Sequence, residues 1–169
     1  SPELRVRSLA AAAEPWPLTQ LAAELRGLTG ELKLSIEQDA AVAAGATTTQ
    51  PQEVLGQILR AVVTNAADAC RSRPGSSGVQ VRLVAAEGQA QISVVDDGIG
   101  MAPQAAAAAF DPFFSTKAEG QGMGLGLYLA RAHLRALGGT IELESRPGLG
   151  TTVLVRFPLT EPLRPGRAA

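Results

Sequence analysis

The feature that most constrains the fold of this chain is a pair of β-hairpins, each with two short strands around a turn that contains glycine. The predicted strands are Val79–Ala85 with Ala90–Val95, and Thr140–Glu144 with Thr151–Phe157. Apolar and polar residues alternate in them, which is typical of strands that bury one face. A short connection that contains glycine predicts antiparallel pairing. The chain is therefore expected to contain a sheet with adjacent antiparallel strands.

Helical patterns alternate with these strands. Apolar residues three or four positions apart predict helices from Leu18 to Gly27 or Gly30, over Pro51–Arg71, and over Met123–Leu137. A half-buried strand is expected at Glu31–Glu37, a surface loop at 40–50, and a short helix or coil at Ala102–Ala109. Hairpin-linked strands with interspersed helices predict an α+β fold. We expect a two-layer sandwich whose mixed, mostly antiparallel sheet has helices on one face.

The length of 169 residues is that of one ordinary domain with tails. Residues 1–16 are expected to be the end of a preceding helix, a linker or a tag remnant. Residues 17–159 are expected to form the domain. The tail at 160–169 carries too little apolar surface to fold and is expected to be disordered.

Charge and cysteine content exclude some classes of function. The net charge is −1, with 15 basic and 16 acidic residues mixed along the chain, so no overall field favours nucleic acid or an anionic membrane. The single cysteine, Cys70, cannot form an internal disulfide, and we interpret it as a small apolar filler. No segment approaches the roughly 18 apolar residues of a membrane span. A cytoplasmic location is expected, although a full-length protein with a membrane anchor is compatible with this sequence.

Two segments place oxygen ligands where a ligand can reach them. Asn65 lies near the rim of the apolar face of the second predicted helix, where an amide oxygen suits a hard cation such as Mg²⁺. Asp96 ends a buried strand and precedes Gly98 and Gly100, which let the backbone approach a flat ligand closely. Each segment also has a purely structural reading, as a helix-end asparagine and as an acidic turn.

Two later segments suggest contacts to an anion. Residues 110–117, FDPFFSTK, hold three of the four phenylalanines of the chain and end in Lys117, which can reach phosphate as a point charge. Residues 120–127, GQGMGLGL, place alternating glycines before a helix, so that free N–H groups lie at the positive end of its dipole. No Walker-type GK[ST] follows, and no strand precedes as in a dinucleotide fingerprint.

In this order and at these separations, the four segments resemble the ATP-binding domain of bacterial sensor histidine kinases. That domain belongs to a wider group with gyrase-type, Hsp90-type and MutL-type ATPases. The matching boxes are NAADA at 65–69, DDGIG at 96–100, FDPFFSTK at 110–117 and GMGLGL at 122–127. The third and fourth boxes and the C-terminal hairpin are similar to the nitrogen-regulation type of kinase. The resemblance covers about Leu18–Leu159, and although each box alone is weak evidence, all four in order are specific.

The resemblance implies the Bergerat ATP-binding fold, with ATP and Mg²⁺ as ligands and transfer of the γ-phosphoryl group to a histidine. It implies that Asn65 holds Mg²⁺, that Asp96 rather than Asp97 binds adenine, and that Lys117 lies near the phosphates on a lid. The implied nucleotide site comprises Asn65, Asp96, Gly98, Gly100, Met101, Phe110, Lys117, Gly122, Met123, Gly124, Leu125 and Gly126. The implied partners are a dimerisation domain with the acceptor histidine, absent from this chain, and a response regulator; the isolated chain is expected to be a monomer.

Two positions depart from the family pattern. Ala61 stands where the family usually carries a polar residue, and Met123 stands where threonine is common. These departures leave open a nucleotide-binding pseudokinase, and a regulatory ATPase or serine kinase of the anti-sigma type is a further alternative. The lone histidine, His133, has Ala132 and Leu134 as neighbours rather than an acid. It is interpreted as a structural or surface residue, so the chain alone is not expected to phosphorylate itself.

Overall fold

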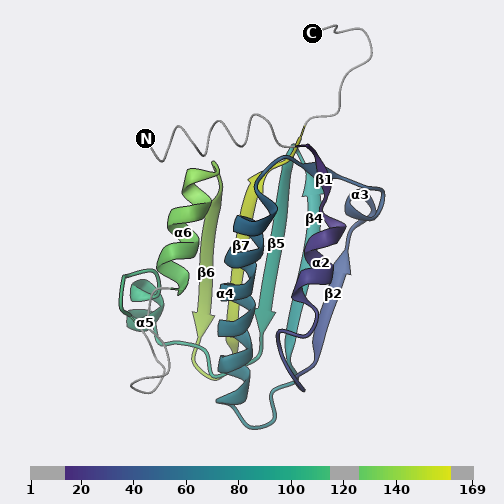
Figure 1. Cartoon of the computed structure of the whole chain (residues 1–169). Coiled ribbons are helices and arrows are strands. Elements are labelled where there is room, and N and C mark those ends of the chain that lie inside the picture. The colour runs from purple at the N-terminus through teal and green to yellow at the C-terminus, as the bar shows by residue number, and fades with distance from the viewer. Residues whose placement is uncertain (1–13, 115–125, 161–169) are drawn as a thin grey trace, which may run out of the picture.

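The computed structural model describes residues 14–114 and 126–160, which form a sheet layer and a helix layer (Figure 1). Five strands lie in the order β2-β4-β5-β7-β6. They are β2 (Leu34–Gln38), β4 (Val79–Ala86), β5 (Gln89–Asp96), β6 (Thr140–Arg146) and β7 (Gly150–Pro158). β2 pairs with β4 in parallel, and the other neighbouring pairs are antiparallel. The predicted α+β sandwich with a mixed, mostly antiparallel sheet is confirmed.

Three helices lie side by side over one face of the sheet (Figure 1). They are α2 (Thr19–Leu25), α4 (Gln52–Arg71) and α6 (Gly126–Ala136), while the short α5 (Pro103–Ala108) lies near β6. α4 is central because it packs against both α2 and α6. No helix within residues 14–114 and 126–160 combines the length and apolar character that crossing a membrane requires.

The core lies between the helices and the sheet. Alternate residues of β4 and β5 are buried, and they meet a fully buried stripe of α4 that includes Leu55, Leu59 and Val63. Burial of one such aliphatic side chain contributes about 1.5–3 kcal/mol relative to its exposure. The packing fixes the rotation of α4, so it also fixes which residues of this helix lie at the edge of the core.

The prediction of a surface loop over residues 40–50 is wrong. This segment contains the short helix α3 (Ala40–Ala43) and the strand β3 (Thr47–Thr48), which pairs with β1 (Trp16–Pro17). One carboxylate oxygen of Asp39 caps α3 by accepting from the Val42 N–H at 2.9 Å. The other accepts from the Ala85 N–H of β4 at 3.2 Å. This tertiary cap, together with burial of Val42, orders a segment that has few large side chains.

The first helix and the first long strand have different bounds from those expected. α2 ends at Leu25, and β2 begins only at Leu34. Thr29 explains the late start of β2, because its hydroxyl donates to the Leu32 carbonyl at 2.8 Å and its own carbonyl accepts from the Leu32 N–H. These bonds form a turn where the strand was expected to begin. The described part of the third predicted helix is Gly126–Ala136, and residues 123–125 lie outside the described ranges.

Contacts tie both ends of the described chain to the fold. The Trp16 indole N–H donates to the Gln50 carbonyl at 2.8 Å, and the Thr160 N–H donates to the Thr47 carbonyl at 3.0 Å. Ordered contacts therefore reach one residue beyond each end of the 17–159 range. That domain range itself stays a prediction.

Candidate functional site

Asp96 is the last residue of β5, and its side chain lies on the same side of the strand as the buried Ile92 and Val94. Only 5% of its surface is exposed. One carboxylate oxygen accepts from the Gly98 N–H at 2.9 Å. Burial raises the pKa of Asp96, and the backbone N–H groups of Gly98 and Thr151 oppose this shift in part. The result is a fixed hydrogen-bond acceptor directed toward the helix layer.

Asp97 lies in a different environment from its neighbour. Its carboxylate accepts from the Ser77 N–H at 2.7 Å, from the Ser77 hydroxyl at 2.5 Å and from the Gly78 N–H at 3.2 Å. These donors hold the pKa of Asp97 well below its usual range. Asp97 is therefore engaged with the chain segment that precedes β4, and Asp96 is the carboxylate directed toward the helices.

The glycines after Asp96 permit close backbone approaches. A Cβ atom at Gly98 would collide with the backbone of Ala69 on α4. Gly100 has φ of +65°, and a Cβ atom there would collide with the Arg146 carbonyl of β6. Both positions accept only a residue without a side chain unless the neighbouring backbone moves.

Hydrogen bonds hold the segment 96–101 between α4 and the β6–β7 hairpin. The Ile99 N–H donates to the Ala69 carbonyl at 3.1 Å, and the Ile99 carbonyl accepts from the Gly148 N–H at 2.7 Å. The Met101 N–H donates to the Ser145 hydroxyl oxygen at 2.8 Å. The glycine-containing turn is thus an ordered wall rather than a free loop.

Asn65 lies on α4 midway between two contacts of this helix. Ala61, Asn65 and Ala69 are spaced four residues apart, so they share one face, and all three are half-buried. Ala69 contacts the turn at Gly98. At the other end, a Cβ atom built on Gly126, the first residue of α6, would lie 3.9 Å from Ala61 Cβ. Asn65 therefore lies between the Asp96 turn and the start of α6.

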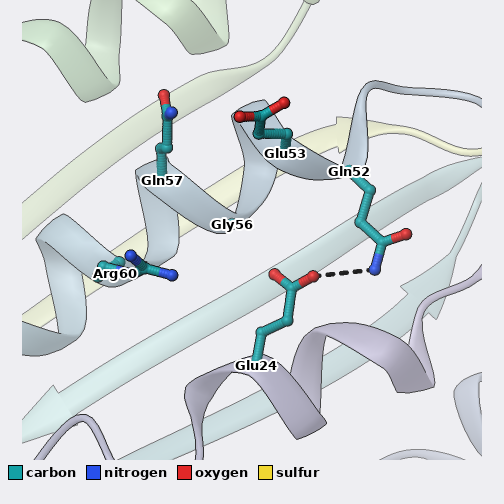
Figure 2. Close-up of a pocket in the computed structure, with 6 residues that line it drawn as sticks. All are labelled: Glu24, Gln52, Glu53, Gly56, Gln57 and Arg60. Carbon is teal, nitrogen blue, oxygen red and sulfur yellow. Dashed lines mark hydrogen bonds between the residues drawn. The ribbon is translucent and has the colours of Figure 1, made fainter.

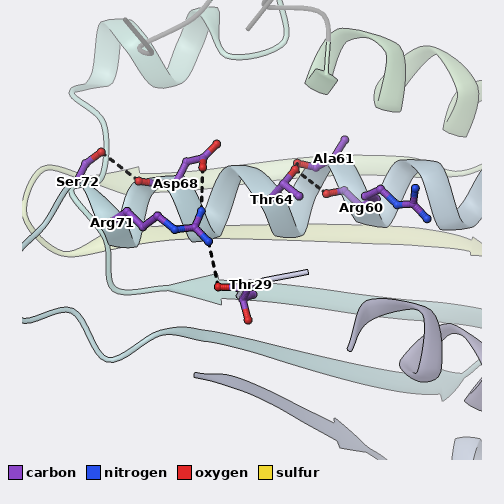
Figure 3. Close-up of polar contacts among 7 residues, drawn as sticks. All are labelled: Thr29, Arg60, Ala61, Thr64, Asp68, Arg71 and Ser72. Atoms are coloured by element: carbon purple, nitrogen blue, oxygen red, sulfur yellow. Dashed lines mark hydrogen bonds and ion pairs between the residues drawn. The ribbon is translucent and has the colours of Figure 1, made fainter. Parts of the chain in front are cut away.

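Polar contacts fix the helix around this position (Figure 3). The Thr64 hydroxyl donates to the Arg60 carbonyl at 2.7 Å. Near the end of the helix, Arg71 forms an ion pair with Asp68 at 3.1 Å and also donates to the Thr29 carbonyl at 3.0 Å. The last turns of α4 are thus tied to the connection between α2 and β2.

The phenylalanine-rich segment is described as far as Phe114. Phe110 packs against the core, and the Arg131 guanidinium of α6 lies 5.0 Å from the centre of its ring. Phe113 has φ of +66° and is 75% exposed. Lys117, Gly122, Met123, Gly124 and Leu125 lie outside the described residues. Of the predicted phosphate-binding run, Gly126 is described, and it begins α6.

A separate groove of about 550 Å³ lies between α2 and the first half of α4 (Figure 2). Glu24, Gln52, Glu53, Gly56, Gln57 and Arg60 line it. The Gln52 amide donates to the Glu24 carboxylate at 2.9 Å across the groove. Its lining is polar and mixed in charge, and it shares no residue with the predicted nucleotide site.

Sequence reasoning did not single out Arg73, Ser77 or Ser145, the residues that support the Asp96–Met101 turn. Their signals in the sequence are weak, because serine and arginine in the turns at 71–78 and 145–150 are ordinary turn and surface residues. Only the tertiary structure shows that these side chains contact the turn.

The arrangement can bind a ligand with three different chemical groups. A buried carboxylate acceptor lies at one end, an amide oxygen on α4 lies in the middle, and the N-terminus of an 11-residue helix lies at the other end. The carboxylate suits an exocyclic amine, the amide suits a hard cation, and the helix N-terminus suits an anion.

Curated proteins that are similar to this chain include sensor kinases. Two-component sensor PprA of Pseudomonas aeruginosa is 35% identical over 173 residues, which cover 96% of this chain and 18% of that protein. Sensor histidine kinase ZraS of Klebsiella oxytoca is 36% identical over 142 residues, covering 78% of this chain and 30% of its own length. The chain thus spans less than a third of these two curated relatives.

Solved structures share the fold. The mycobacterial sensor histidine kinase MprB aligns with a TM-score of 0.70 at 23% identity, covering 88% of this chain and 98% of that one. Full-length ShkA, solved in complex with AMPPNP, aligns with a TM-score of 0.69 at 26% identity, covering 99% of this chain and 36% of that one. Residues 50–161 match the family described as histidine kinase-, DNA gyrase B-, and HSP90-like ATPase. The chain belongs to this ATPase family, in the branch formed by the catalytic domains of sensor histidine kinases.

Proposed function

We propose that this domain binds ATP with Mg²⁺ and supplies the γ-phosphoryl group to a histidine on a dimerisation domain outside this chain. The observation that carries the proposal is the buried Asp96 carboxylate, because it begins a turn whose Gly98 contacts Ala69, on the same face of α4 as Asn65. That face ends beside the N-terminus of α6. The ShkA structure, solved in complex with AMPPNP, supports a nucleotide as the ligand.

Each end of the site would bind a different part of the nucleotide. Asp96 would accept a hydrogen bond from the adenine amine, with Gly98, Gly100 and Met101 forming the wall beside the base and ribose. Gly122, Met123, Gly124, Leu125 and Gly126 would contribute N–H groups to the phosphates at the start of α6. Phe110 and Lys117 would belong to the segment that covers them. This assignment follows the family motif, position by position.

Asn65 would hold Mg²⁺ through its amide oxygen. The half-buried position of Asn65 on α4, between the turn and α6, fits a ligand that shares the ion with phosphate oxygens and water. When bound, the ion would neutralise charge on the phosphates. The residues of the chain would orient the γ-phosphoryl group for in-line attack, and this positioning accounts for most of the catalysis in phosphoryl transfer.

Calorimetric titration with a non-hydrolysable ATP analogue tests the proposal. We expect saturable binding in the presence of Mg²⁺ and clearly weaker binding with a chelator, because the triphosphate would then lack its counter-ion. An Asn65→Ala variant is expected to lose most of the Mg²⁺ dependence. Absence of binding at millimolar analogue would exclude the proposal.

A nucleotide-binding regulator without kinase activity is the second candidate, and Ala61 favours it. This methyl side chain lies beside the start of α6, at a position where the resemblance implies a polar residue that helps with metal binding or proton transfer. Joining this domain to the dimerisation helices of its full-length protein and measuring transfer to histidine separates the two. A kinase forms phosphohistidine, whereas a regulator binds ATP and forms none.

We further propose that the full-length protein signals to a response regulator, as its resemblance to two-component sensors suggests. The isolated domain is proposed to be a cytoplasmic monomer, since the expected dimerisation helices belong to the other domain. Sedimentation of the chain with and without nucleotide tests the oligomeric state.

A further inference from the structure

We propose that Asp97 is a positioning residue for nucleotide recognition: it fastens the Asp96 turn to the segment before β4 and so keeps the Asp96 carboxylate directed at the base. This inference rests on the proposed binding of ATP by Asp96. It adds a role for a side chain that the nucleotide is not expected to touch.

The backbone ladder between β4 and β5 stops at the residue before Asp97. Asp96 pairs with Val79, and these two residues are the last of β5 and the first of β4 in the antiparallel ladder. Beyond this pair, the ladder gives the turn no further hydrogen bonds to β4. The Asp97 side chain takes over there, because it accepts from Ser77 and Gly78, the two residues that precede Val79. The Asp97 carboxylate thus provides the hydrogen bonds to the segment before β4 that the backbone ladder no longer provides.

Asp97 is held through both its side chain and its backbone carbonyl. While its carboxylate binds Ser77 and Gly78, its carbonyl oxygen accepts from the Arg73 guanidinium at 2.6 Å. Rotation of the peptide between Asp97 and Gly98 would break this bond. Two anchors on one residue therefore restrict the direction in which the neighbouring Asp96 side chain leaves the backbone.

The segment that donates to the Asp97 carboxylate is itself fixed by hydrogen bonds on both sides. The Ser76 hydroxyl donates to the Cys70 carbonyl at the end of α4 at 2.7 Å. On the other side, the Val79 N–H donates to the Lys33 carbonyl at 2.9 Å, and a Cβ atom at Gly78 would collide with that same carbonyl. The Asp97 contact can position the Asp96 turn only if the segment before β4 does not move together with the turn.

The strength of the contact agrees with this role. The Asp97 carboxylate accepts from two backbone N–H groups, from one hydroxyl and, at 3.7 Å, from the Cys70 thiol. Hydrogen bonds to a charged acceptor are roughly twice as strong as neutral ones. The depressed pKa of Asp97 means that the charged form persists through the neutral range. The contact is therefore maintained under the conditions in which nucleotide binds.

The test compares ATP with inosine triphosphate, whose base carries an oxygen in place of the exocyclic amine. Both are titrated calorimetrically with Mg²⁺ into the whole chain. We expect the wild-type protein to prefer ATP. In Asp97→Ala, we expect the Kd for ATP to rise about tenfold, as for a lost charged hydrogen bond, and the Kd for inosine triphosphate to change less than twofold.

Matched variants separate positioning from loss of structure. Ser77→Ala removes one donor and keeps both backbone donors, so a smaller shift in the same direction is expected, and Asp97→Asn should restore part of the preference. Glu144→Ala, which removes an exposed carboxylate of β6, should leave both Kd values unchanged. All titrations are made well below the melting temperature of each variant. If Asp97 only stabilised the fold, Asp97→Ala would lower the melting temperature without altering the preference for ATP.

Two outcomes would overturn the inference. If Asp97→Ala weakens both nucleotides equally or leaves the preference intact, Asp97 does not position Asp96, while ATP binding itself still stands. If the wild-type protein does not prefer ATP, the adenine role of Asp96 fails, and the positioning role of Asp97 fails with it.

Discussion

Adjacent carboxyl groups with opposite pKa shifts define the site at the scale of single residues. Burial raises the pKa of Asp96, whereas hydrogen bonds from Ser77 and Gly78 lower that of Asp97. The chemistry of the two side chains is the same, so the difference comes from the strand end, where one residue is directed inward and the next is directed toward the β4 side. Asp96 is therefore the residue whose ionisation state depends on burial.

Replacing Asp96 by asparagine is expected to separate binding from stability. The Kd for ATP should rise about 10- to 100-fold, because a hydrogen bond to a charged acceptor contributes about 1.5–3 kcal/mol. In the unliganded protein, the raised pKa means that ionising Asp96 costs stability, and this cost appears as pH rises through the folded-state pKa. The variant, which carries no such charge, should therefore gain stability relative to wild type as pH increases.

Urea denaturation of both proteins between about pH 4 and pH 8, without nucleotide, measures this difference. The sign is fixed: a folded-state pKa above the unfolded value gives stability that is present at low pH and lost at high pH. A difference between variant and wild type that stays constant across this range would show that Asp96 titrates alike in both states.

The Gly98→Ala variant tests the contact between the turn and α4. The added methyl group would meet the Ala69 backbone, which cannot move without disturbing the helix. We expect the free energy of unfolding to fall by about 1–3 kcal/mol, as for an overpacked site, and nucleotide binding to weaken with it. Wild-type stability in this variant, measured by denaturant unfolding, would contradict the contact.

At the scale of secondary-structure elements, the sequence predicts the helices and strands whose pattern of apolar residues is local. The alternation in β4 and β5 and the apolar stripe of α4 predict these three elements within a few residues of their observed ends. The segment at 40–50 was missed because its order depends on the Asp39 cap and on burial of Val42 and Thr48 by distant parts of the chain.

The candidate site likewise contains some residues that form a local sequence pattern and others that depend on distant contacts. Asp96, Gly98 and Gly100 form a local motif, and so they are readable from sequence. The residues that support the turn cannot be identified from the sequence, because Ser77 lies 20 positions from Asp97 and Ser145 lies 44 positions from Met101. Only the register of the sheet brings such residues together.

Within α4, Gly56→Ala is expected to have the opposite effect to Gly98→Ala. A Cβ atom at Gly56 would lie 2.5 Å from a Glu24 carboxylate oxygen (Figure 2), but this is the end of a flexible side chain. Moving it breaks an exposed hydrogen bond to Gln52 and little else. Alanine is favoured over glycine in a helix by about 1 kcal/mol, so we expect a gain of about 0.5 kcal/mol.

Denaturant unfolding of both glycine variants checks this contrast in a single experiment. Nucleotide affinity should stay unchanged in Gly56→Ala, because the groove shares no residue with the proposed site. A loss of stability in this variant would mean that Glu24 cannot leave its position between α2 and α4.

At the scale of the whole molecule, the proposed function makes this chain a donor of phosphoryl groups whose acceptor histidine lies on another domain. The proposed phosphate end of the site is the start of α6 at Gly126, and the single histidine of the chain, His133, is exposed on the same helix. The two residues are seven positions apart on the α-helix, which is about 10 Å along the axis. In-line transfer requires reacting atoms about 3–3.5 Å apart.

Incubation of the chain with γ-labelled ATP and Mg²⁺ is therefore expected to give no phosphohistidine, although ATP binds. The helix would keep His133 too far from a γ-phosphoryl group bound at Gly126 within one molecule, and the chain has no other histidine to act as acceptor. The readout is protein-bound label that withstands alkali and is removed by acid, with His133→Ala as the matched control. Such label on wild type that disappears in His133→Ala would contradict the prediction, since it would require His133 of one molecule to enter the site of another.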